Sequence, residues 1–160
     1  MKNKTIWSNR FKNKTSLSLQ KIGSSIHIDK RLYEQDIAAS IIHTQMLIKQ
    51  KIIKYEDGNK IINGLKKIKV HIEKGNFEFK EKFEDIHLNI EKALFEIIGP
   101  SAGFLHTARS RNDQVVTDFK LWIKEATKEI LKSISLVMKA LIRKAEKRQG
   151  DIIIELLQDI

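Results

Sequence analysis

The chain has 160 residues, of which 41% are hydrophobic, so it is long enough to enclose a hydrophobic core. It contains no cysteine, which excludes disulfide bonds and thiolate metal sites. No run of about 18 apolar residues is present, which excludes a membrane-spanning helix. The first 25 residues are polar and rich in lysine rather than apolar like a signal peptide, so we expect a cytoplasmic protein with no membrane partner.

The net charge of +10 raises the possibility of nucleic-acid binding. Residues 1–30 hold seven lysines and arginines against one acidic residue, Asp29, so this segment alone carries +6 of the total. Lysine outnumbers arginine 24 to 6, and no aromatic platform or zinc-finger spacing accompanies the charge. We therefore expect no specific nucleic-acid binding. A basic binding module in residues 1–30 stays an alternative that salt-sensitive binding to random duplex would favour.

The first part of the chain predicts an arm followed by two helices. Residues 1–30 show no sustained hydrophobic period, which is typical of an extended arm. Apolar residues at helical spacing then predict a helix that is capped by Asp29 and runs to about Lys51. Tyr55–Gly58 is expected to form a turn, and a second helix follows to about Lys74.

The second part of the chain predicts two further helices. Phenylalanines in residues 77–83 line a short connector, and a third helix runs from about Glu84 to Gly99–Pro100. The last periodic pattern extends from about Asn112 to about Arg148 without a break, which exceeds an ordinary globular helix. It also carries apolar residues off its main stripe, so we expect partners around it, either further helices or other subunits.

The densest polar cluster lies directly before this last helix. Guanidinium groups and hydrogen-bond donors at a helix N-terminus can bind a carboxylate or phosphate, so the segment predicts an anion-binding site. A purely structural alternative is that Ser110 or Asn112 caps the helix while the arginines pair at the surface. The cluster consists of Thr107, Arg109, Ser110, Arg111, Asn112, Asp113 and Gln114.

The same segment carries a family resemblance. Leu105–Asp118, LHTARSRNDQVVTD, resembles the first signature segment of the argininosuccinate lyase family within the fumarase/aspartase superfamily. Trp7–Phe11 resembles the N-terminal Trp-Gly-Gly-Arg-Phe of that family, with Ser8 and Asn9 in place of the two glycines. Ser25 and Asp29 take the places of a serine and an aspartate before the first helix of the family, and residues 84–91 resemble its Glu-Asp-Ile-His segment.

The resemblance implies a mainly α fold, with a helical N-terminal domain followed by the first long helix of a fumarase/aspartase-type central bundle. Residues 1–30 would be the arm, 31–110 the small helical domain, and 111–150 the first long helix, which four subunits pool in a homotetramer. Residues 151–160 would be a truncated or frameshifted tail. The implied reaction is the β-elimination of argininosuccinate to arginine and fumarate in arginine biosynthesis, without a metal or an organic cofactor.

The resemblance also implies roles for individual residues. Ser25 and Asn112 would contact the substrate, and five others would line the same cleft: Thr107, Arg109, Ser110, Arg111 and Gln114. Asp85 and His87 would support the site without being the principal acid or base. Their structural alternative is that Asp85 favours a helix N-terminus while His87 and Glu91 form an i,i+4 surface pair.

The later signature segments of the family, which carry its catalytic histidine, serine and lysine, do not occur in this sequence. We therefore expect the 160-residue chain alone to lack lyase activity. The alternatives are a subunit of a split enzyme, a non-catalytic helical assembly protein, or another superfamily member such as adenylosuccinate lyase or aspartase.

Overall fold

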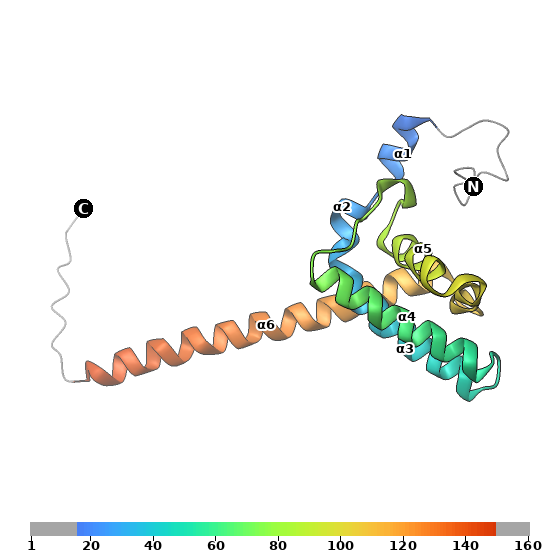
Figure 1. The fold of residues 1–160 in the computed structure, drawn as a ribbon. Coiled ribbons are helices and arrows are strands. Elements are labelled where there is room, and N and C mark those ends of the chain that lie inside the picture. The colour runs from blue at the N-terminus through green and yellow to red at the C-terminus, as the bar shows by residue number, and fades with distance from the viewer. Residues whose placement is uncertain (1–15, 150–160) are drawn as a thin grey trace. The chain divides into compact units, whose positions relative to one another are not determined.

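The computed structural model describes residues 16–149, and all the regular structure in this range is helical (Figure 1). The prediction of a mainly α fold is confirmed. By their internal contacts the residues divide into two units, 1–122 and 123–160, which are described separately below. The division falls twelve residues beyond position 110, where the sequence predicts a domain boundary, so that the first turns of the last helix belong to the first unit.

The first unit begins with short helices where the sequence predicts an extended arm. α1 (Leu17–Gly23), α2 (Ile26–Asp29) and the 3-10 turn η1 (Lys30–Leu32) follow one another. The main-chain N–H groups of residues 25 and 26 donate to the carbonyl of Glu84 at 2.9 and 3.1 Å, so a distant part of the chain holds these turns. The prediction of an extended arm is therefore wrong for residues 17–29. The Trp7–Phe11 segment lies outside the described residues.

α3 (Tyr33–Lys49) begins four residues after Asp29, because η1 intervenes. The prediction that Asp29 caps this helix is wrong: the cap residue is Leu32, which makes no side-chain cap bond. The carboxylate of Asp29 instead accepts hydrogen bonds from Ser25 Oγ at 2.6 Å and from the main-chain N–H of Ile86 at 3.2 Å. Asp29 thus joins α2 to the start of α5.

α4 (Tyr55–Glu73) contains the predicted turn at residues 55–58 as its first helical turn. Two acidic residues there, Glu56 and Asp57, interact favourably with the positive end of the helix dipole, which explains why the segment is helical. The chain then passes through η2 (Glu81–Phe83) into α5 (Ile86–Ile98), which Gly99 ends with a φ of 69°.

The core of the first unit lies between α3, α4, α5 and the 3-10 segment η3 (Gly99–His106). Gly64 allows α4 to approach α5 closely, because a Cβ at this position would collide with Leu94. Burial of these aliphatic side chains supplies the main stabilisation of the unit. The fully buried hydrophobic residues include Ile37, Leu47, Ile61, Leu65, Ile86, Ile90, Leu94 and Leu105.

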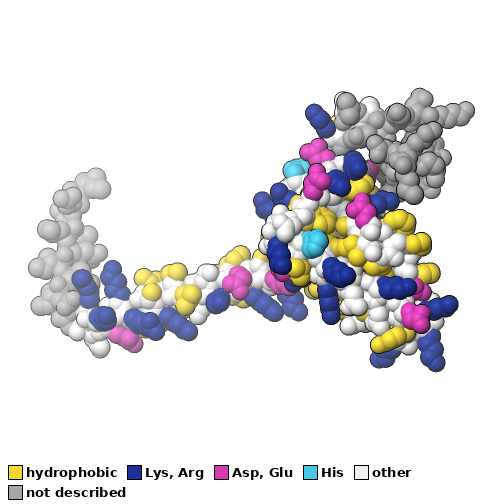
Figure 2. Space-filling view, in the orientation of Figure 1, with side chains coloured by type: hydrophobic (Ala, Val, Ile, Leu, Met, Phe, Trp, Pro, Cys, Tyr) yellow, Lys and Arg dark blue, Asp and Glu magenta, His cyan; other side chains and the backbone are white. Residues whose placement is uncertain are grey.

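The second unit contains the greater part of α6 (Arg111–Lys147), from residue 123 onward. Its large apolar side chains are exposed, with Ile130 and Leu131 at 60% and Leu141 at 62%. They gather along one side of the helix, and lysines and arginines follow the other side (Figure 2). No helix in residues 16–149 is long and apolar enough to cross a membrane.

Candidate functional site

The polar cluster predicted from the sequence forms the loop between η3 and α6, residues 107–110, together with the first turn of α6. His43 of α3 holds this loop through a 2.9 Å hydrogen bond between its Nε2 and the carbonyl of Thr107. Ala108 has a φ of 55°, in the left-handed region that non-glycine residues rarely adopt. Ser110 Oγ accepts from the main-chain N–H of Asn112 at 3.2 Å, so Ser110 does cap α6, as the structural alternative predicts. The loop therefore combines a cap with a strained residue.

Arg109 turns toward α3. Its Nη1 donates to Ser40 Oγ at 3.0 Å, while its Nε and Nη2 are buried and make no hydrogen bond within the described part of the chain. Burial lowers the pKa of Arg109, and the charges of Asp36 and Glu91 partly oppose this effect. The guanidinium stays charged, because an arginine loses its proton only far above neutral pH. The guanidinium of Arg109 thus places a half-buried positive charge between the loop and α3.

Arg111 makes two short hydrogen bonds. Its Nη1 donates to Gln114 Oε1 at 2.6 Å, and its Nη2 donates to Glu91 Oε1 of α5 at 2.7 Å. The same Glu91 oxygen lies 3.4 Å from His106 Nδ1. The alternative that the arginines form surface ion pairs therefore holds for Arg111, whose side chain is 27% exposed. This pairing fixes the guanidinium at the first turn of α6.

Gln114 is buried, with only 3% of its surface exposed. Its Nε2 donates to Asp36 Oδ1 of α3, and its Oε1 accepts from Arg111. Gln114 therefore lies in the protein interior, beneath the exposed residues at the start of α6. Its amide links the partly exposed Arg111 to a carboxylate in the protein interior.

The carboxylate of Asp36 belongs to a buried cluster that joins three helices. His87 Nδ1 of α5 lies 3.1 Å from Asp36 Oδ1 and 3.5 Å from Asp118 Oδ2 of α6. All three side chains are at most 2% exposed. The alternative that His87 forms a surface pair with Glu91 is therefore wrong, because α5 turns His87 toward the core while Glu91 bonds Arg111.

The protonation states in this cluster follow from burial and proximity. Burial raises the pKa of Asp118 to about 8, and the neighbouring charge of Asp36 adds to the rise. Burial also favours a neutral Asp36, but the adjacent His87 and the hydrogen bond from Gln114 hold its pKa below the usual value. Burial disfavours the charged form of His87, yet the contact with Asp36 at 3.1 Å and the other nearby carboxylates raise its pKa. These shifts favour the ionised form of Asp36, the protonated form of His87 and the neutral form of Asp118.

The same three side chains could supply ligands to a metal ion, since their ligand atoms lie within 4.8 Å of one another. The surroundings of these side chains fit a proton shared between Asp36 and Asp118 better than they fit a metal ion. Gln114 Nε2 already donates to Asp36, and the charge of Arg109 already interacts with Asp36 and Asp118. The buried Asp118 oxygens accept no hydrogen bond from the described residues. A proton on the Asp118 carboxyl would give it a partner, because the O–H group could then donate to Asp36.

Ser25 and Asp85 lie at the neighbouring N-terminus of α5. Asp85 Oδ1 accepts from the main-chain N–H of Leu88 at 2.7 Å, so Asp85 caps α5, as its structural alternative predicts. Asp29 bonds both Ser25 Oγ and the N–H of Ile86. Burial raises the pKa of Asp29, although the Ser25 hydrogen bond opposes the rise. This carboxylate therefore ties Ser25 to the helix that carries His87.

The predicted site residues differ in their accessibility to a ligand. Ser25, Ser110 and Asn112 are exposed, whereas Gln114 and His87 are buried. Thr107, Asp85 and both arginines are half-buried. The exposed residues can touch a ligand directly, and the buried ones can act only through their neighbours in this structure.

Sequence reasoning did not identify Asp36, Ser40 and Asp118 as site residues. Asp36, Ser40 and Thr44 are buried at four-residue intervals, so one face of α3 carries a polar stripe among the core residues. A charged residue inside an apolar helical pattern is the signal that could have indicated Asp36 and Asp118.

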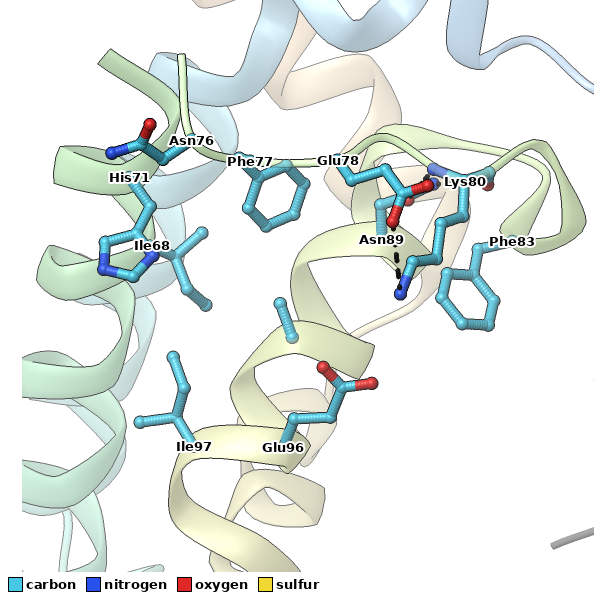
Figure 3. Close-up of a pocket in the computed structure, with 11 residues that line it drawn as sticks. Ile68, His71, Asn76, Phe77, Glu78, Lys80, Phe83, Asn89, Glu96 and Ile97 are labelled. Carbon is cyan, nitrogen blue, oxygen red and sulfur yellow. Dashed lines mark hydrogen bonds and ion pairs between the residues drawn. The ribbon is translucent and has the colours of Figure 1, made fainter. Parts of the chain in front are cut away.

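A separate pocket of about 230 Å³ lies between α4, α5 and the connector that joins them (Figure 3). None of the predicted site residues lines it. Asn89 holds the connector, since its side chain accepts from the N–H of Lys80 at 2.8 Å and donates to the Lys80 carbonyl at 3.2 Å. The lining includes Ile68, Phe77, Phe83 and Ile97, with His71, Glu78 and Glu96 among its polar members.

Comparisons with known proteins agree with the resemblance read from the sequence. The chain is 54% identical over 145 residues to an argininosuccinate lyase of Pelagibacter ubique, covering 91% of this chain and 31% of that protein. It is 47% identical over 142 residues to an argininosuccinate lyase of Bartonella bacilliformis, covering 89% of this chain and 30% of that protein. The chain thus spans a little under a third of the length of the curated relatives it matches. Residues 9–154 match the family described as "Lyase", and the chain therefore belongs to the lyase family.

Proposed function

We propose that this chain supplies the part of an argininosuccinate lyase that holds the substrate at the start of α6. The observation that carries the proposal is the 54% identity to the argininosuccinate lyase of Pelagibacter ubique over 91% of this chain. The reaction is the β-elimination of argininosuccinate to arginine and fumarate. It needs no metal or organic cofactor in this proposal, and the protein would act in the cytoplasm.

The chemistry explains why donors must surround the substrate. A base removes the proton next to a substrate carboxylate, negative charge develops on that carboxylate, and the guanidinium group leaves as arginine. Preorganised hydrogen-bond donors stabilise such charge strongly in a site from which water is excluded. The exposed hydroxyl of Ser25 and the amide of Asn112 are the donors that we assign to direct contact with the substrate.

The remaining loop residues would shape the positive lining of the same site. We assign Thr107, Ser110 and the two arginines to this lining. The arginines are held in place by their contacts with Ser40, Glu91 and Gln114. The first turn of α6 adds the positive end of a helix dipole, which also favours a carboxylate. Asp85 and His87 would support the site from α5 rather than transfer the proton.

The exposed apolar stripe of α6 supports a further part of the proposal. Apolar surface of this extent on one helix is characteristic of a buried position in an assembly. We therefore assign it to contacts between helices of a homo-oligomer, a tetramer by family resemblance.

A chimera tests the proposed function. Residues 9–154 of this chain replace the matching part of the Pelagibacter ubique enzyme, and the ultraviolet absorbance of fumarate is followed with argininosuccinate as substrate. We expect the chimera to release fumarate and Asn112→Ala to reduce the rate by about 100-fold or more, since a lost transition-state donor has this size of effect. Asn63→Ala, at an exposed asparagine of α4 outside the site, serves as the matched control. A folded chimera without activity, or one unaffected by Asn112→Ala, would contradict the proposal.

A further inference from the structure

A continuous series of polar contacts connects the interior of the first unit with the first turn of α6. His87 Nδ1 contacts Asp36 Oδ1 at 3.1 Å, and Gln114 Nε2 donates to the same oxygen. Gln114 Oε1 accepts from Arg111 Nη1 at 2.6 Å, and Arg111 Nη2 donates to Glu91 Oε1 at 2.7 Å. The series passes from α5 to α3 to α6 and returns to α5.

The order of donors and acceptors in this series depends on the orientation of the Gln114 side-chain amide. A glutamine side chain has a donor end and an acceptor end, whereas an ionised carboxylate only accepts and a guanidinium only donates. Gln114 lies between one of each, so only one orientation of its amide satisfies both neighbours. In the reverse orientation two oxygens would face each other at Asp36, and NH₂ would face the guanidinium of Arg111. A buried amide cannot exchange these bonds for water.

We propose that Asp36 is a positioning residue that fixes the amide of Gln114 and thereby holds the guanidinium of Arg111 at the start of α6. Arg111 is fixed from two sides, by Gln114 and by Glu91, which leaves its orientation determined before a ligand arrives. The importance of this orientation for substrate rests on the proposed function, in which Arg111 lines the site. The contact itself does not depend on it.

His87 and Asp118 keep Asp36 in the form that this role needs. A neutral Asp36 could place an O–H toward Gln114 and remove the preference for one amide orientation. The imidazole of His87 lies 3.1 Å from Asp36 and favours the ionised carboxylate, and a neutral carboxyl of Asp118 can donate to it. The other titratable or charged groups near the cluster include Arg109, Asp29, Asp85 and Glu91.

The test exchanges donor and acceptor without changing size. Asp36→Asn is nearly isosteric, but its NH₂ group can face Gln114 and turn the amide, which removes the acceptor from Arg111. Adding Gln114→Glu restores the pattern, because the new carboxylate accepts from the new amide at position 36 with one oxygen and from Arg111 with the other. The double variant also keeps the total charge. A role in packing alone would be insensitive to both changes.

Hydrogen exchange of the side-chain N–H groups is measured by NMR on the full 160-residue chain labelled with ¹⁵N, without substrate. The Asp36→Asn variant and the double variant are each compared with the wild type, and Glu129→Gln, at an exposed residue further along α6, is the control for a lost charge. We expect the Arg111 Nη protons to exchange about tenfold faster or more in Asp36→Asn, to recover most of their protection in the double variant, and to be unchanged in Glu129→Gln.

Unchanged exchange at Arg111 in a folded Asp36→Asn variant, or no recovery in a folded double variant, would overturn the proposal. If the variants do not fold, hydrogen exchange in the wild type tests the proposal. We expect the side-chain amide protons of Gln114 to exchange at least about tenfold more slowly than those of the exposed Asn112. Equal rates would overturn the proposal. Since no substrate is present, failure here differs from failure of the chimera to release fumarate.

Discussion

Asp36 and Asp118 come from two helices, yet their carboxyl oxygens lie 3.1 and 3.5 Å from the same nitrogen, His87 Nδ1. Two ionised carboxylates so close together in a buried place would repel each other strongly. The raised pKa values of Asp118 and His87 favour a proton on each, and the lowered pKa of Asp36 favours the charge that would balance an imidazolium. The cluster can therefore be buried with no net charge.

The first prediction concerns pH. Asp118 has a raised pKa of about 8 in the folded state, so its contribution to stability is complete below its ordinary value near 3.8 and is lost as the pH rises through about 8. The raised pKa of His87 acts in the same direction, and its contribution is lost as the pH rises through its folded value. The lowered pKa of Asp36 acts oppositely, and its contribution is lost only as the pH falls through its folded value.

The free energy of unfolding of the wild type should accordingly fall as the pH rises from about 5 to about 9, by at most about 1.4 kcal/mol per pH unit for each proton. Asp118→Asn removes one titrating group and should give a flatter curve in urea unfolding. Asp57→Asn, a half-buried carboxylate whose Oδ1 accepts from Ser101, is the control. Identical pH profiles for wild type and Asp118→Asn would show that Asp118 carries no proton in the folded state.

The second prediction concerns Arg109. Ser40→Ala removes the acceptor of Nη1, leaving the guanidinium with less compensation for its burial. We expect a loss of about 1–3 kcal/mol in the free energy of unfolding, measured by chemical denaturation. The exposed Ser18→Ala should change it little. Equal effects of the two variants would mean that the bond to Ser40 contributes no stability.

The third prediction uses the backbone of Ala108, which has a φ of 55°. Ala108→Gly should raise the free energy of unfolding by roughly 0.5–1 kcal/mol, because the left-handed conformation strains any residue with a Cβ. The same change at the exposed Ala38 of α3 should lower it by about 1 kcal/mol, since glycine is unfavourable inside a helix. Destabilisation by Ala108→Gly would contradict the assigned strain.

The fourth prediction concerns the apolar stripe of α6, where Ile134 and Leu141 are 50% and 62% exposed. Sedimentation should show association that increases with concentration, since burying this surface is favourable. Changing both residues to lysine should reduce it, whereas changing Lys128 and Lys139 to alanine should not. A chain that stays monomeric at every concentration tested would contradict this prediction.

Long periodic segments were predicted well from the sequence. The α5 and α6 patterns gave helices whose ends lie within two residues of the predicted positions, because an apolar stripe at helical spacing is a local signal. α1 and α2 were missed, since they are short and since residues 24–26, between α1 and the start of α2, are held by bonds to residue 84, about 60 positions away. No local pattern can report such a contact.

The candidate site was predicted only in its contiguous part. The residues of the loop between η3 and α6 stand together in the sequence, so their chemistry was visible. Asp36, His87 and Asp118 are spread over 82 positions and meet only through the packing of α3, α5 and α6. The burial of Gln114 likewise results from that packing, and a sequence pattern alone did not separate it from its exposed neighbours.

Glu84 acts on Ser25 through its carbonyl oxygen, which accepts from the N–H groups of residues 25 and 26 and from the hydroxyl of Ser24. The side chain of Glu84 has no part in these bonds. These bonds therefore depend on the length of the connector before Glu84 and on its backbone, whose φ of 63° disfavours β-branched residues, rather than on its side chain. Insertion or deletion of a residue there would displace a carbonyl that three donors share, and with it the segment that presents Ser25.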